Sequence, residues 1–357
     1  MKIARAEVIP LDLPLAHGYR IAGRTITHVR NFFIRLETDG GLAGHGNAAP
    51  AEEVTGESDS MCHAALGGSL RELAMGADPT AAHAALSARA REMAPACPAA
   101  RAALDIALWD LAGQAAGLPL VKLWGGSWRR LPTSTTIGVC GPEETLDSAR
   151  AWLKQGFRIL KVKVGEDVEA DVARLRLLRE TFGSTVTLRA DANQGYTLEQ
   201  ARAFLRGAEG AGLELLEQPL GAGDLAGLAV LRAESRVPIL ADESARSPEE
   251  AEEVIRRGAA HGLNVKLMKC GGPTPARAIH DRARAAGLSL MLGCNDESRV
   301  SMAAAAHLAL ALPGFTYADL DGHLDLARDP ASGGLEIRDG MLSVSERPGL
   351  GVEVSIS

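Results

Sequence analysis

The feature that most constrains the fold is a regular alternation of short apolar runs and helix-like segments from about residue 133 onward. Eight runs rich in apolar and β-branched residues are separated by polar segments with helical character. This alternation predicts βαβ units and therefore a parallel sheet. Eight such units favour a closed (β/α) barrel over an open sheet. The runs read TTIGV, LKVKV, VTLRADA, LELLEQP, PILADE, LNVKLMK, LSLMLG and TYADLD.

The first 125 residues mix strand and helix signals instead. The stretch VRNFFIRLETDGGLAGHGNA predicts a hairpin with Asp-Gly-Gly at its turn, and PAARAALDIALWDLAGQAAGLPL predicts a helix that ends at Gly117. We therefore predict an α/β protein with two domains. Residues 1–125 form an α+β capping domain, completed by a C-terminal tail of about 330–357, and residues 126–329 form a modified TIM barrel.

Composition argues against several classes of protein. The chain has 357 residues, of which 46% are hydrophobic, so it can bury a large core. Its net charge of −7 and scattered basic residues argue against nucleic acid or a membrane surface as a partner. Five cysteines without a C-x-x-C pair argue against a disulfide framework or a zinc site. The first residues lack the apolar core of a signal peptide, so we expect a cytoplasmic protein. Because symmetric assembly from identical chains is common among soluble proteins, we also expect a homo-oligomer.

Charged residues recur at the ends of successive strands with the period of one barrel unit. Lys163, Asp191, Glu217, Asp242 and Lys266 follow one another at intervals of 24 to 28 positions. In a barrel the C-terminal ends of the strands form the active-site face. These five side chains are therefore expected to converge at one mouth of the barrel.

The three carboxylates of this set predict a metal site. Carboxylates crowded together repel one another and cannot all stay ionised without a cation. A site of oxygen ligands that leaves room for water and substrate suits Mg²⁺. Asn193 and Glu243, which lie beside two of these acids, are expected to support them. The alternative is that each acid caps a helix or pairs with a neighbour.

The lysines of the second and sixth strands predict acid–base chemistry. Lys161 and Lys163 share the inward face of one strand because they are two residues apart, and Lys266 lies across the barrel. Lysines crowded near a metal ion and near each other have a lowered pKa, so one of them can be neutral and act as a base near pH 7. Lys269 is expected to point to the other side of its strand and to be structural.

The motifs LKVKV, RADANQ, EQP, ADES and NVKLMKCGG, in this order and spacing, resemble the muconate-lactonizing-enzyme subgroup of the enolase superfamily. The resemblance spans nearly the whole chain. It implies Mg²⁺-assisted removal of a proton α to a carboxylate, through an enediolate. It also implies that Lys163 and Lys266 are the acid–base pair on the two faces of the α-carbon, with Lys161 in electrostatic support.

The eighth strand narrows the resemblance further. Asp319 and Asp321 share one face, and this D-x-D is similar to the pair with which dipeptide epimerases bind the substrate's ammonium group. Arg24, in a loop of the capping domain, and Thr136, on the first strand, resemble substrate contacts of the same family. The resemblance therefore implies epimerisation of a dipeptide at the α-carbon of its C-terminal residue, by two-base 1,1-proton transfer between lysines.

The side-chain preference is predicted from Asp296, where epimerases of Ala-Glu dipeptides tend to carry an apolar residue. An acid there could pair with a Lys or Arg side chain of a cationic dipeptide, and Glu52 and Glu53 could add to a negative rim. Ala51 departs from the acid expected nearby, and Arg24 would also suit a glutamate. Five alternatives stay open: an Ala-Glu epimerase, a cycloisomerase, an o-succinylbenzoate synthase, an N-acylamino acid racemase, and a metal-dependent binding protein without catalysis.

Overall fold

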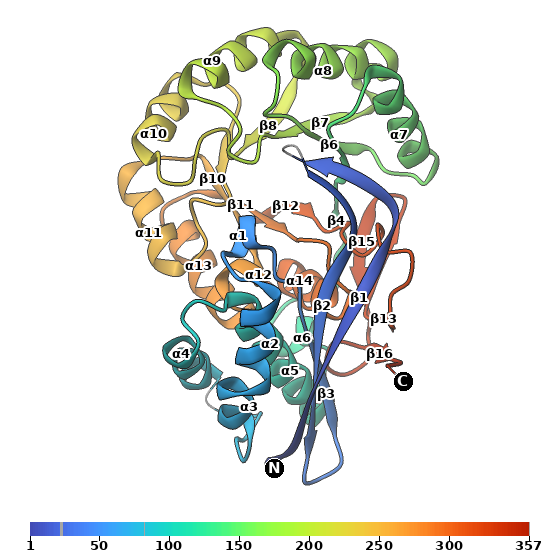
Figure 1. The fold of residues 1–357 in the computed structure, drawn as a ribbon, viewed down its shortest axis with the longest axis vertical. Helices are drawn as coiled ribbons and strands as arrows, with labels where there is room; N and C mark the ends of the chain where they lie inside the picture. Colours follow the sequence, from blue (N-terminus) through green and yellow to red (C-terminus); the bar gives the residue numbers. More distant parts are fainter. Residues whose placement is uncertain (22–23, 82, 357) are drawn as a thin grey trace.

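The computed structural model shows a ring of strands and helices, with the N-terminal residues packed as a separate layer beside it (Figure 1). It describes residues 1–21, 24–81 and 83–356, with side chains for all of these except residues 17, 19–21, 24 and 25. Within these ranges, no helix is long and apolar enough to cross a membrane.

The eight predicted strands form one parallel sheet in sequential order from β5 to β12. Lys163 pairs with Asp191 and Asp191 pairs with Glu217, so these strand ends lie at the same height. Thr133, just before β5, bridges in parallel to Ala318 of β12 and closes the ring. The strands are β5 Thr135–Ile137, β6 Ile159–Lys163, β7 Thr187–Asp191, β8 Leu213–Glu217, β9 Ile239–Ala241, β10 Gly262–Lys266, β11 Ser289–Gly293 and β12 Phe315–Asp319.

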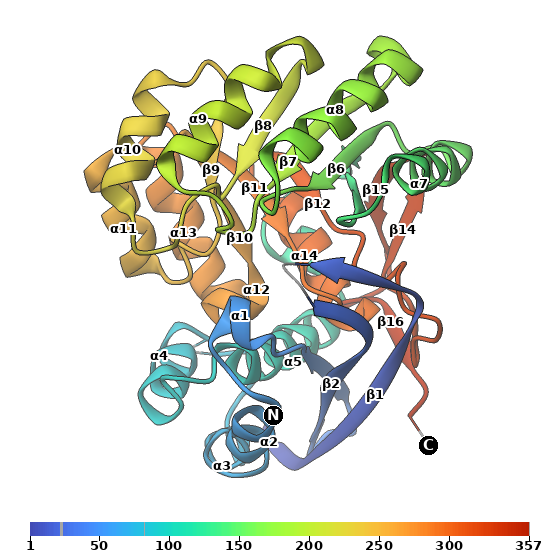
Figure 2. The same ribbon diagram turned by 45° about the horizontal axis from the view of Figure 1, so that its top comes forward.

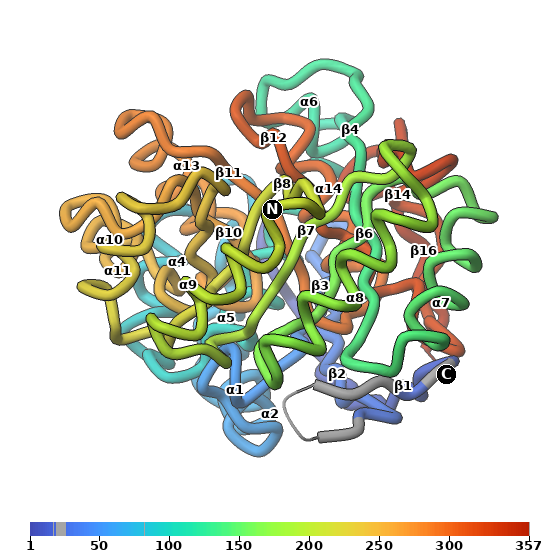
Figure 3. Tube along the Cα trace, turned by 90° about the horizontal axis from the view of Figure 1, so that it is seen from above, coloured from blue at the N-terminus to red at the C-terminus, as the bar shows by residue number. Residues whose placement is uncertain are grey.

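Helices cover the outside of this ring, as the view from above shows (Figure 3). Each strand from β5 to β11 is followed by a helix, and β12 is followed directly by the tail, as the sequence predicts. Local signals begin these helices: Asp167 accepts hydrogen bonds from the first turn of α8, and Thr197 forms a capping box on α9. The helices are α7 Pro142–Lys154, α8 Val168–Phe182, α9 Leu198–Gly207, α10 Leu225–Glu234, α11 Pro248–Arg257, the one-turn α12 Leu267–Cys270, α13 Pro273–Ala285 and α14 Arg299–Ala311.

The capping domain is an antiparallel sheet of β1, β2 and β3 packed against helices, and its predicted hairpin at residues 39–41 is present. The Ala-rich helix α5 crosses this sheet closely. A Cβ atom at Gly46 would lie 1.8 Å from the carbonyl oxygen of Ala103, so only glycine fits there. The elements are β1 Ile3–Ile21, β2 Arg24–Thr38, β3 Ala43–Ala48, α1 Glu52–Thr55, α2 Asp59–Gly67, α3 Ser69–Ala74, α4 His83–Met93, α5 Pro98–Ala116 and α6 Leu120–Leu123.

The C-terminal tail contains the predicted hairpin and contacts both parts of the chain. The hairpin of β14 Leu335–Arg338 and β15 Met341–Val344 pairs with β4 Leu131–Pro132, while β13 Ala331–Gly333 pairs with β16 Val352–Val354. Farther along, Gly349 exchanges backbone hydrogen bonds with residues 118 and 120 of the capping domain. The domain boundaries at residues 125 and 329 stay predictions.

Two buried asparagines fasten the capping sheet to the mouth of the barrel. Asn31 of β2 donates to the carbonyl of Asp296 at 3.3 Å and accepts from the backbone N–H of Ser298 at 3.2 Å. Asn47 of β3 donates to Asn31 at 3.0 Å and accepts from the hydroxyl of Ser301. The hairpin of β1 and β2 extends beyond this contact toward the barrel mouth (Figure 2). These bonds fix the capping domain over the C-terminal ends of the strands.

We predict that Asp110→Ala lowers the thermal midpoint by several degrees. The buried carboxylate of Asp110 accepts from the backbone N–H groups of His45 at 3.0 Å and Leu350 at 2.8 Å, which joins α5 to β3 and to the tail. Each donor left unpaired costs about 1–3 kcal/mol. Scanning calorimetry measures the change, with Asp147→Ala on the exposed face of α7 as the matched control. An unchanged midpoint for Asp110→Ala would contradict this reading.

Candidate active site

One large cavity of about 1420 Å³ lies between the capping domain and the C-terminal ends of the barrel strands. It collects residues that the sequence spreads over the whole chain. Most of the residues that we predicted for the site line it. The three carboxylates of the predicted metal site do not line it; they are buried and in contact with its lysines. The predicted residues on its surface are Glu52, Glu53, Thr136, Lys161, Lys163, Asn193, Lys266, Asp296, Asp319 and Asp321.

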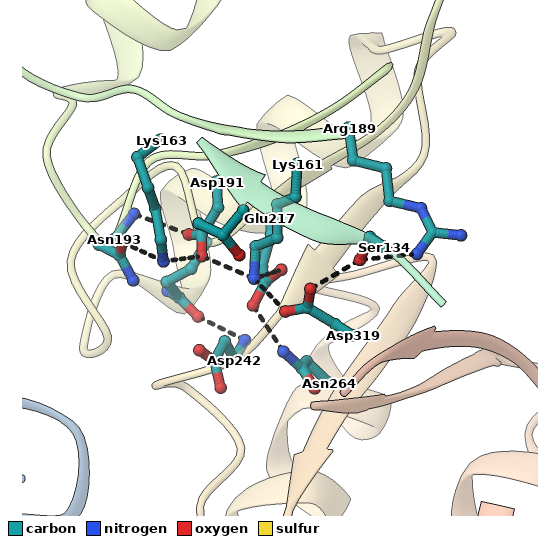
Figure 4. Close-up of polar contacts among 12 residues, drawn as sticks. Ser134, Lys161, Lys163, Arg189, Asp191, Asn193, Glu217, Asp242, Asn264 and Asp319 are labelled. Atoms are coloured by element: carbon teal, nitrogen blue, oxygen red, sulfur yellow. Dashed lines mark hydrogen bonds and ion pairs between the residues drawn. The ribbon is translucent and has the colours of Figure 1, made fainter. Parts of the chain in front are cut away.

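Lys161 stands at the centre of the buried charges (Figure 4). Its ammonium nitrogen lies 2.6 Å from Asp319, 2.9 Å from Glu217 and 3.0 Å from Asp191, and the side chain is 2% exposed. Burial alone would lower the pKa of Lys161, but the charges of Asp191, Asp319 and Glu217 together raise it well above its ordinary value. Lys161 is therefore a permanent cation in this structure, which fits a supporting electrostatic role.

Lys163 and Lys266 enter the cavity from opposite sides of the ring, because β6 and β10 are four places apart in the eight-stranded order. The ammonium group of Lys163 donates to Asp191 at 2.7 Å and to Asn193 at 2.8 Å (Figure 4). That of Lys266 lies 2.8 Å from Asp242. Each lysine is thus held beside one of the three carboxylates. Both lysines line the cavity, which lies between them.

Among the protein's own side chains, acids dominate the surroundings of Lys266, and the expected lowering of a lysine pKa by a metal and neighbouring lysines stays a prediction. Burial alone would lower that pKa, but the charge of Asp242 outweighs burial and raises it above the ordinary value. The reason is that the acids outnumber the cations around each lysine. Lys161 and Lys266 serve as the counterions of the carboxylates, and their proximity to each other has the smaller effect.

The three carboxylates have the chemistry of a divalent-cation site. Asp191, Glu217 and Asp242 are fully buried, and burial together with Asp191 raises the pKa of Glu217 to about 8. Three buried carboxylates this close together gain from a further cation beside them. Oxygen Oε2 of Glu217 lies 2.9 Å from the ammonium nitrogen of Lys161, and Oδ2 of Asp242 lies 2.8 Å from that of Lys266. Over the described ranges no three acidic, His or Cys side chains are yet gathered around one point, since lysine ammonium groups stand between the carboxylates.

Asn193 and Glu243 lie beside this centre and contact each other, and their supporting role stays a prediction. The backbone N–H of Asn193 donates to Asp191 at 3.0 Å, and its side-chain amide donates to Glu243 at 3.2 Å. Burial and the charge of Asp242 raise the pKa of Glu243 to about 7. Asn193 holds a positive φ of 41°, which is uncommon for a residue with a side chain and occurs most often at functional sites.

Lys269 does not point away from the site, and this prediction is wrong. Strand β10 ends at Lys266, and the one-turn helix α12 follows. A helical step of three residues returns the side chain of Lys269 toward the strand ends, where its ammonium group donates to the side chain and the carbonyl of Asp242. The period-2 argument failed because the strand had already ended.

The D-x-D pair of the eighth strand is buried in the same cavity, but its two acids have different partners. Asp319 accepts from Lys161 at 2.6 Å and from the hydroxyl of Ser134 at 2.6 Å, so both of its oxygens have donors (Figure 4). Asp321 accepts from the backbone N–H of Thr136 at 2.7 Å through one oxygen. Burial and the charge of Asp319 raise the pKa of Asp321 to about 7, so Asp321 lacks a counterion that a ligand could supply.

A further acid, Asp325, lies with Asp296 on the wall of the cavity. Burial and the charges of Asp321 and Asp296 raise the pKa of Asp325 to about 8, so these three carboxylates share one negative region. The sequence analysis missed Asp325. The side chain of Arg24 lies outside the described residues.

Two other residues, which were not predicted from the sequence, hold the carboxylates Asp242 and Glu217 in position. The side chain of Gln218 accepts from the backbone N–H of Asp242 at 2.8 Å, and Gln218 has a positive φ of 32°. The amide of Asn264 donates to Glu217 at 2.6 Å. Asn264 could have been found from its period-2 spacing to Lys266, and Gln218 from its place beside Glu217.

Comparison with known proteins extends the likeness over the whole chain. Residues 5–125 match the mandelate racemase / muconate lactonizing enzyme, N-terminal domain, and residues 144–356 match the enolase C-terminal domain-like family. The chain is 47% identical to the L-Lys-D/L-Arg epimerase of Methylococcus capsulatus over 99% of both chains. It is 37% identical to the L-Ala-D/L-Glu epimerase of Bacillus subtilis over 99% of this chain and 97% of that one. The chain belongs to the dipeptide epimerase family of the enolase superfamily.

A solved structure of this dipeptide epimerase family has the same fold. The dipeptide epimerase of Methylococcus capsulatus, in complex with Mg and the dipeptide L-Arg-D-Lys, matches with a TM-score of 0.95, 47% identity and 99% of each chain covered. The predicted superfamily, the dipeptide epimerase family and the barrel with an N-terminal capping domain are confirmed. The roles of the individual residues stay predictions.

In this member of the dipeptide epimerase family, we predict that Lys161→Met lowers the thermal midpoint in buffer that contains a chelator. The substitution keeps the bulk of the side chain but leaves Asp191, Glu217 and Asp319 without their common cation. Breaking a buried ion pair by removing one partner costs about 3–5 kcal/mol. Lys154→Met, at the exposed end of α7, removes the same charge and should leave the midpoint unchanged. Equal midpoints for both variants would show that Lys161 does not stabilise the cluster.

Proposed function

We propose that this chain is a Mg²⁺-dependent dipeptide epimerase that inverts the α-carbon of the C-terminal residue. The observation that carries the proposal is the placement of Lys163 and Lys266 on opposite sides of one cavity, beside three buried carboxylates. Membership of the dipeptide epimerase family supports it. A cytoplasmic location and homo-oligomeric assembly stay predictions.

Asp191, Glu217 and Asp242 would hold the Mg²⁺ ion. Each ends or directly follows a strand, all three are fully buried, and each has one oxygen in contact with a lysine ammonium group. Bound there, Mg²⁺ supplies positive charge beside the substrate carboxylate and stabilises the negative charge that develops as the α-proton leaves. The complex of the Methylococcus capsulatus relative with Mg supports this choice of metal.

Lys163 and Lys266 move the proton. In one direction, the neutral amine of one lysine takes the α-proton on its face of the substrate, and the ammonium group of the other returns a proton to the opposite face. In the reverse direction the two exchange roles. The neutral form requires a weaker hold by the carboxylates, and a ligand cation that shares Asp191 and Asp242 reduces that hold. Lys161 stays charged throughout, because Asp319 pairs with it independently of the metal ligands.

Asp321 would bind the ammonium group of the dipeptide. One of its oxygens accepts from the backbone N–H of Thr136, and the other lies 4.0 Å from the thiol sulfur of Cys294. Asp321 lines the cavity, and no lysine or arginine forms an ion pair with it among the described residues. Asp319 adds negative charge beside it while it holds Lys161. The backbone N–H of Thr136 fixes the orientation of the Asp321 carboxylate. An N-acylated amino acid or a cycloisomerase substrate has no ammonium group to offer, so this pair favours a dipeptide.

The cavity wall supports a preference for cationic dipeptides. Asp296 and Asp325 share a negative region with Asp321, where burial and the charges of Asp321 and Asp296 raise the pKa of Asp325, so a cationic side chain would be favoured there. Glu52 and Glu53 lie on the rim of the same cavity. The 47% identity to an L-Lys-D/L-Arg epimerase points in the same direction. Arg24 remains a predicted partner for a substrate carboxylate.

We predict that the protein, incubated with Mg²⁺ and L,L-dipeptides in D₂O, adds one deuterium at the α-carbon of the second residue. Mass spectrometry with fragmentation locates the label. Lys163→Ala and Lys266→Ala should each abolish epimerisation, and one of them should still exchange the proton of one stereoisomer, because each lysine serves one face. Exchange that persists in both variants, or no exchange with any dipeptide, would contradict the proposal and direct the search to N-succinylated amino acids and cycloisomerase substrates.

We also predict that Asp296→Asn and Asp325→Asn each lower kcat/KM for Lys- or Arg-containing dipeptides by about 10-fold, as expected for the loss of a partly buried charge partner. The value for an Ala-Ala dipeptide should change little. Asp147→Asn, on the outer face of α7, is the matched control. Equal losses for cationic and neutral dipeptides would mean that these acids do not select the side chain.

A further inference from the structure

The three carboxylates of the cation site share a property that the proposed ligation does not require. In each of them, one oxygen, here called the rear oxygen, accepts a hydrogen bond from a neighbouring residue that fixes it in place. The other oxygen contacts the ammonium group of Lys161, Lys163 or Lys266. In Asp191, Oδ1 accepts from the backbone of Asn193 while Oδ2 meets Lys161 and Lys163. The same division appears in Glu217 and Asp242, where side chains rather than backbone hold the rear oxygen.

Asn264 of β10 holds the rear oxygen of Glu217. Its amide nitrogen donates to Oε1 at 2.6 Å, while Oε2 lies 2.9 Å from the ammonium nitrogen of Lys161 (Figure 4). Asn264 is fully buried, and its own Oδ1 lacks a hydrogen-bond partner. An unsatisfied buried amide oxygen costs free energy and calls for an explanation. The contact with Glu217 is the one function of this side chain among the described residues.

Lys269 holds the rear oxygen of Asp242. Its ammonium group donates to Oδ1, to the carbonyl of Asp242 at 2.5 Å and to the carbonyl of Asn264 at 2.9 Å, and the side chain is 2% exposed. Three acceptors use the three hydrogens of the ammonium group. Lys269 therefore fixes Asp242 to the strand that carries Asn264, while Oδ2 lies 2.8 Å from the ammonium nitrogen of Lys266.

Gly293 of the neighbouring strand β11 leaves the space that this arrangement needs. A Cβ atom there would lie 2.5 Å from Oδ1 and 2.7 Å from Nδ2 of Asn264. Any side chain at residue 293 would displace the amide from Glu217. The position of Asn264 in the clamp that it forms with Lys269 therefore depends on the space left by Gly293 as well as on hydrogen bonds.

We propose that Asn264 and Lys269 are positioning residues that restrict Glu217 and Asp242 to one oxygen each and thereby select Mg²⁺ over Ca²⁺. The inference rests on the proposed function, because it presumes a cation at these carboxylates. Ca²⁺ accepts bidentate carboxylates and six to eight oxygens in flexible geometry, whereas Mg²⁺ requires a compact octahedron. A carboxylate whose second oxygen is held by a buried amide or ammonium group is fixed in one orientation, which opposes the rotation that bidentate binding requires.

The experiment measures the dissociation constants of Mg²⁺ and of Ca²⁺ separately by titration calorimetry on the chelator-treated full chain. The variants are Lys269→Met, Asn264→Ala and Gly293→Ala, the last of which displaces Asn264 without removing it. Lys154→Met is the control for the loss of one positive charge. Circular dichroism confirms that each variant is folded. If Lys269→Met does not fold, the two uncharged changes decide the outcome.

We expect Mg²⁺ affinity to fall by about 10-fold in the variants, as is usual when a partner of a metal ligand is lost. Ca²⁺ affinity should fall less or rise, so that the ratio of the two affinities shifts toward Ca²⁺ in the variants and stays constant in the control. An unchanged ratio in folded variants would overturn this inference and leave the proposed function standing. A wild-type protein that binds no Mg²⁺ would overturn the proposed function itself.

Discussion

The mutual repulsion of buried carboxylates is the constraint on which the rest of this structure depends. Asp191, Glu217 and Asp242 have no contact with solvent, yet they come from three adjacent strands whose register places them together. Such a group is stable only with cations beside it. The lysines at the strand ends supply that charge here, and the same lysines are the residues proposed to transfer the proton. Stability and chemistry therefore draw on one set of charges.

The two parts of the chain divide the work between them. The barrel carries the charged residues on strands whose positions are fixed by a continuous parallel register, so that groups from β6 and β10 face each other across the ring. The capping domain closes the cavity and reaches the barrel through Asn31 and Asn47. Asp296, an acid that lines the cavity, follows a barrel strand and has its carbonyl bonded to Asn31 of the capping domain, so both parts of the chain fix its position. Such a division allows the side-chain preference to differ among relatives while the barrel chemistry stays the same.

The sequence predicted most of the fold and the central charges, and particular residues show where prediction stopped. The eight strands and their acids were accessible because a barrel repeats at a near-constant interval, and strand ends at one height share one face. Lys269 was misjudged because a period-2 rule does not extend past the end of a strand. Asp325 lies in an irregular segment after β12, where no periodicity tells which side chains turn inward. The lysine pKa depends on the balance of neighbouring acids and lysines in three dimensions, which spacing along the chain does not reveal.

The most direct test of the central claim is a crystal structure of the protein with Mn²⁺ in place of Mg²⁺ and a bound dipeptide, with the metal located by anomalous scattering. The account predicts one peak bound by Asp191, Glu217 and Asp242, and an α-carbon between the side chains of Lys163 and Lys266. It also predicts that the ammonium group of the dipeptide contacts Asp321. A metal held elsewhere, or an α-carbon that faces only one of the two lysines, would contradict the account.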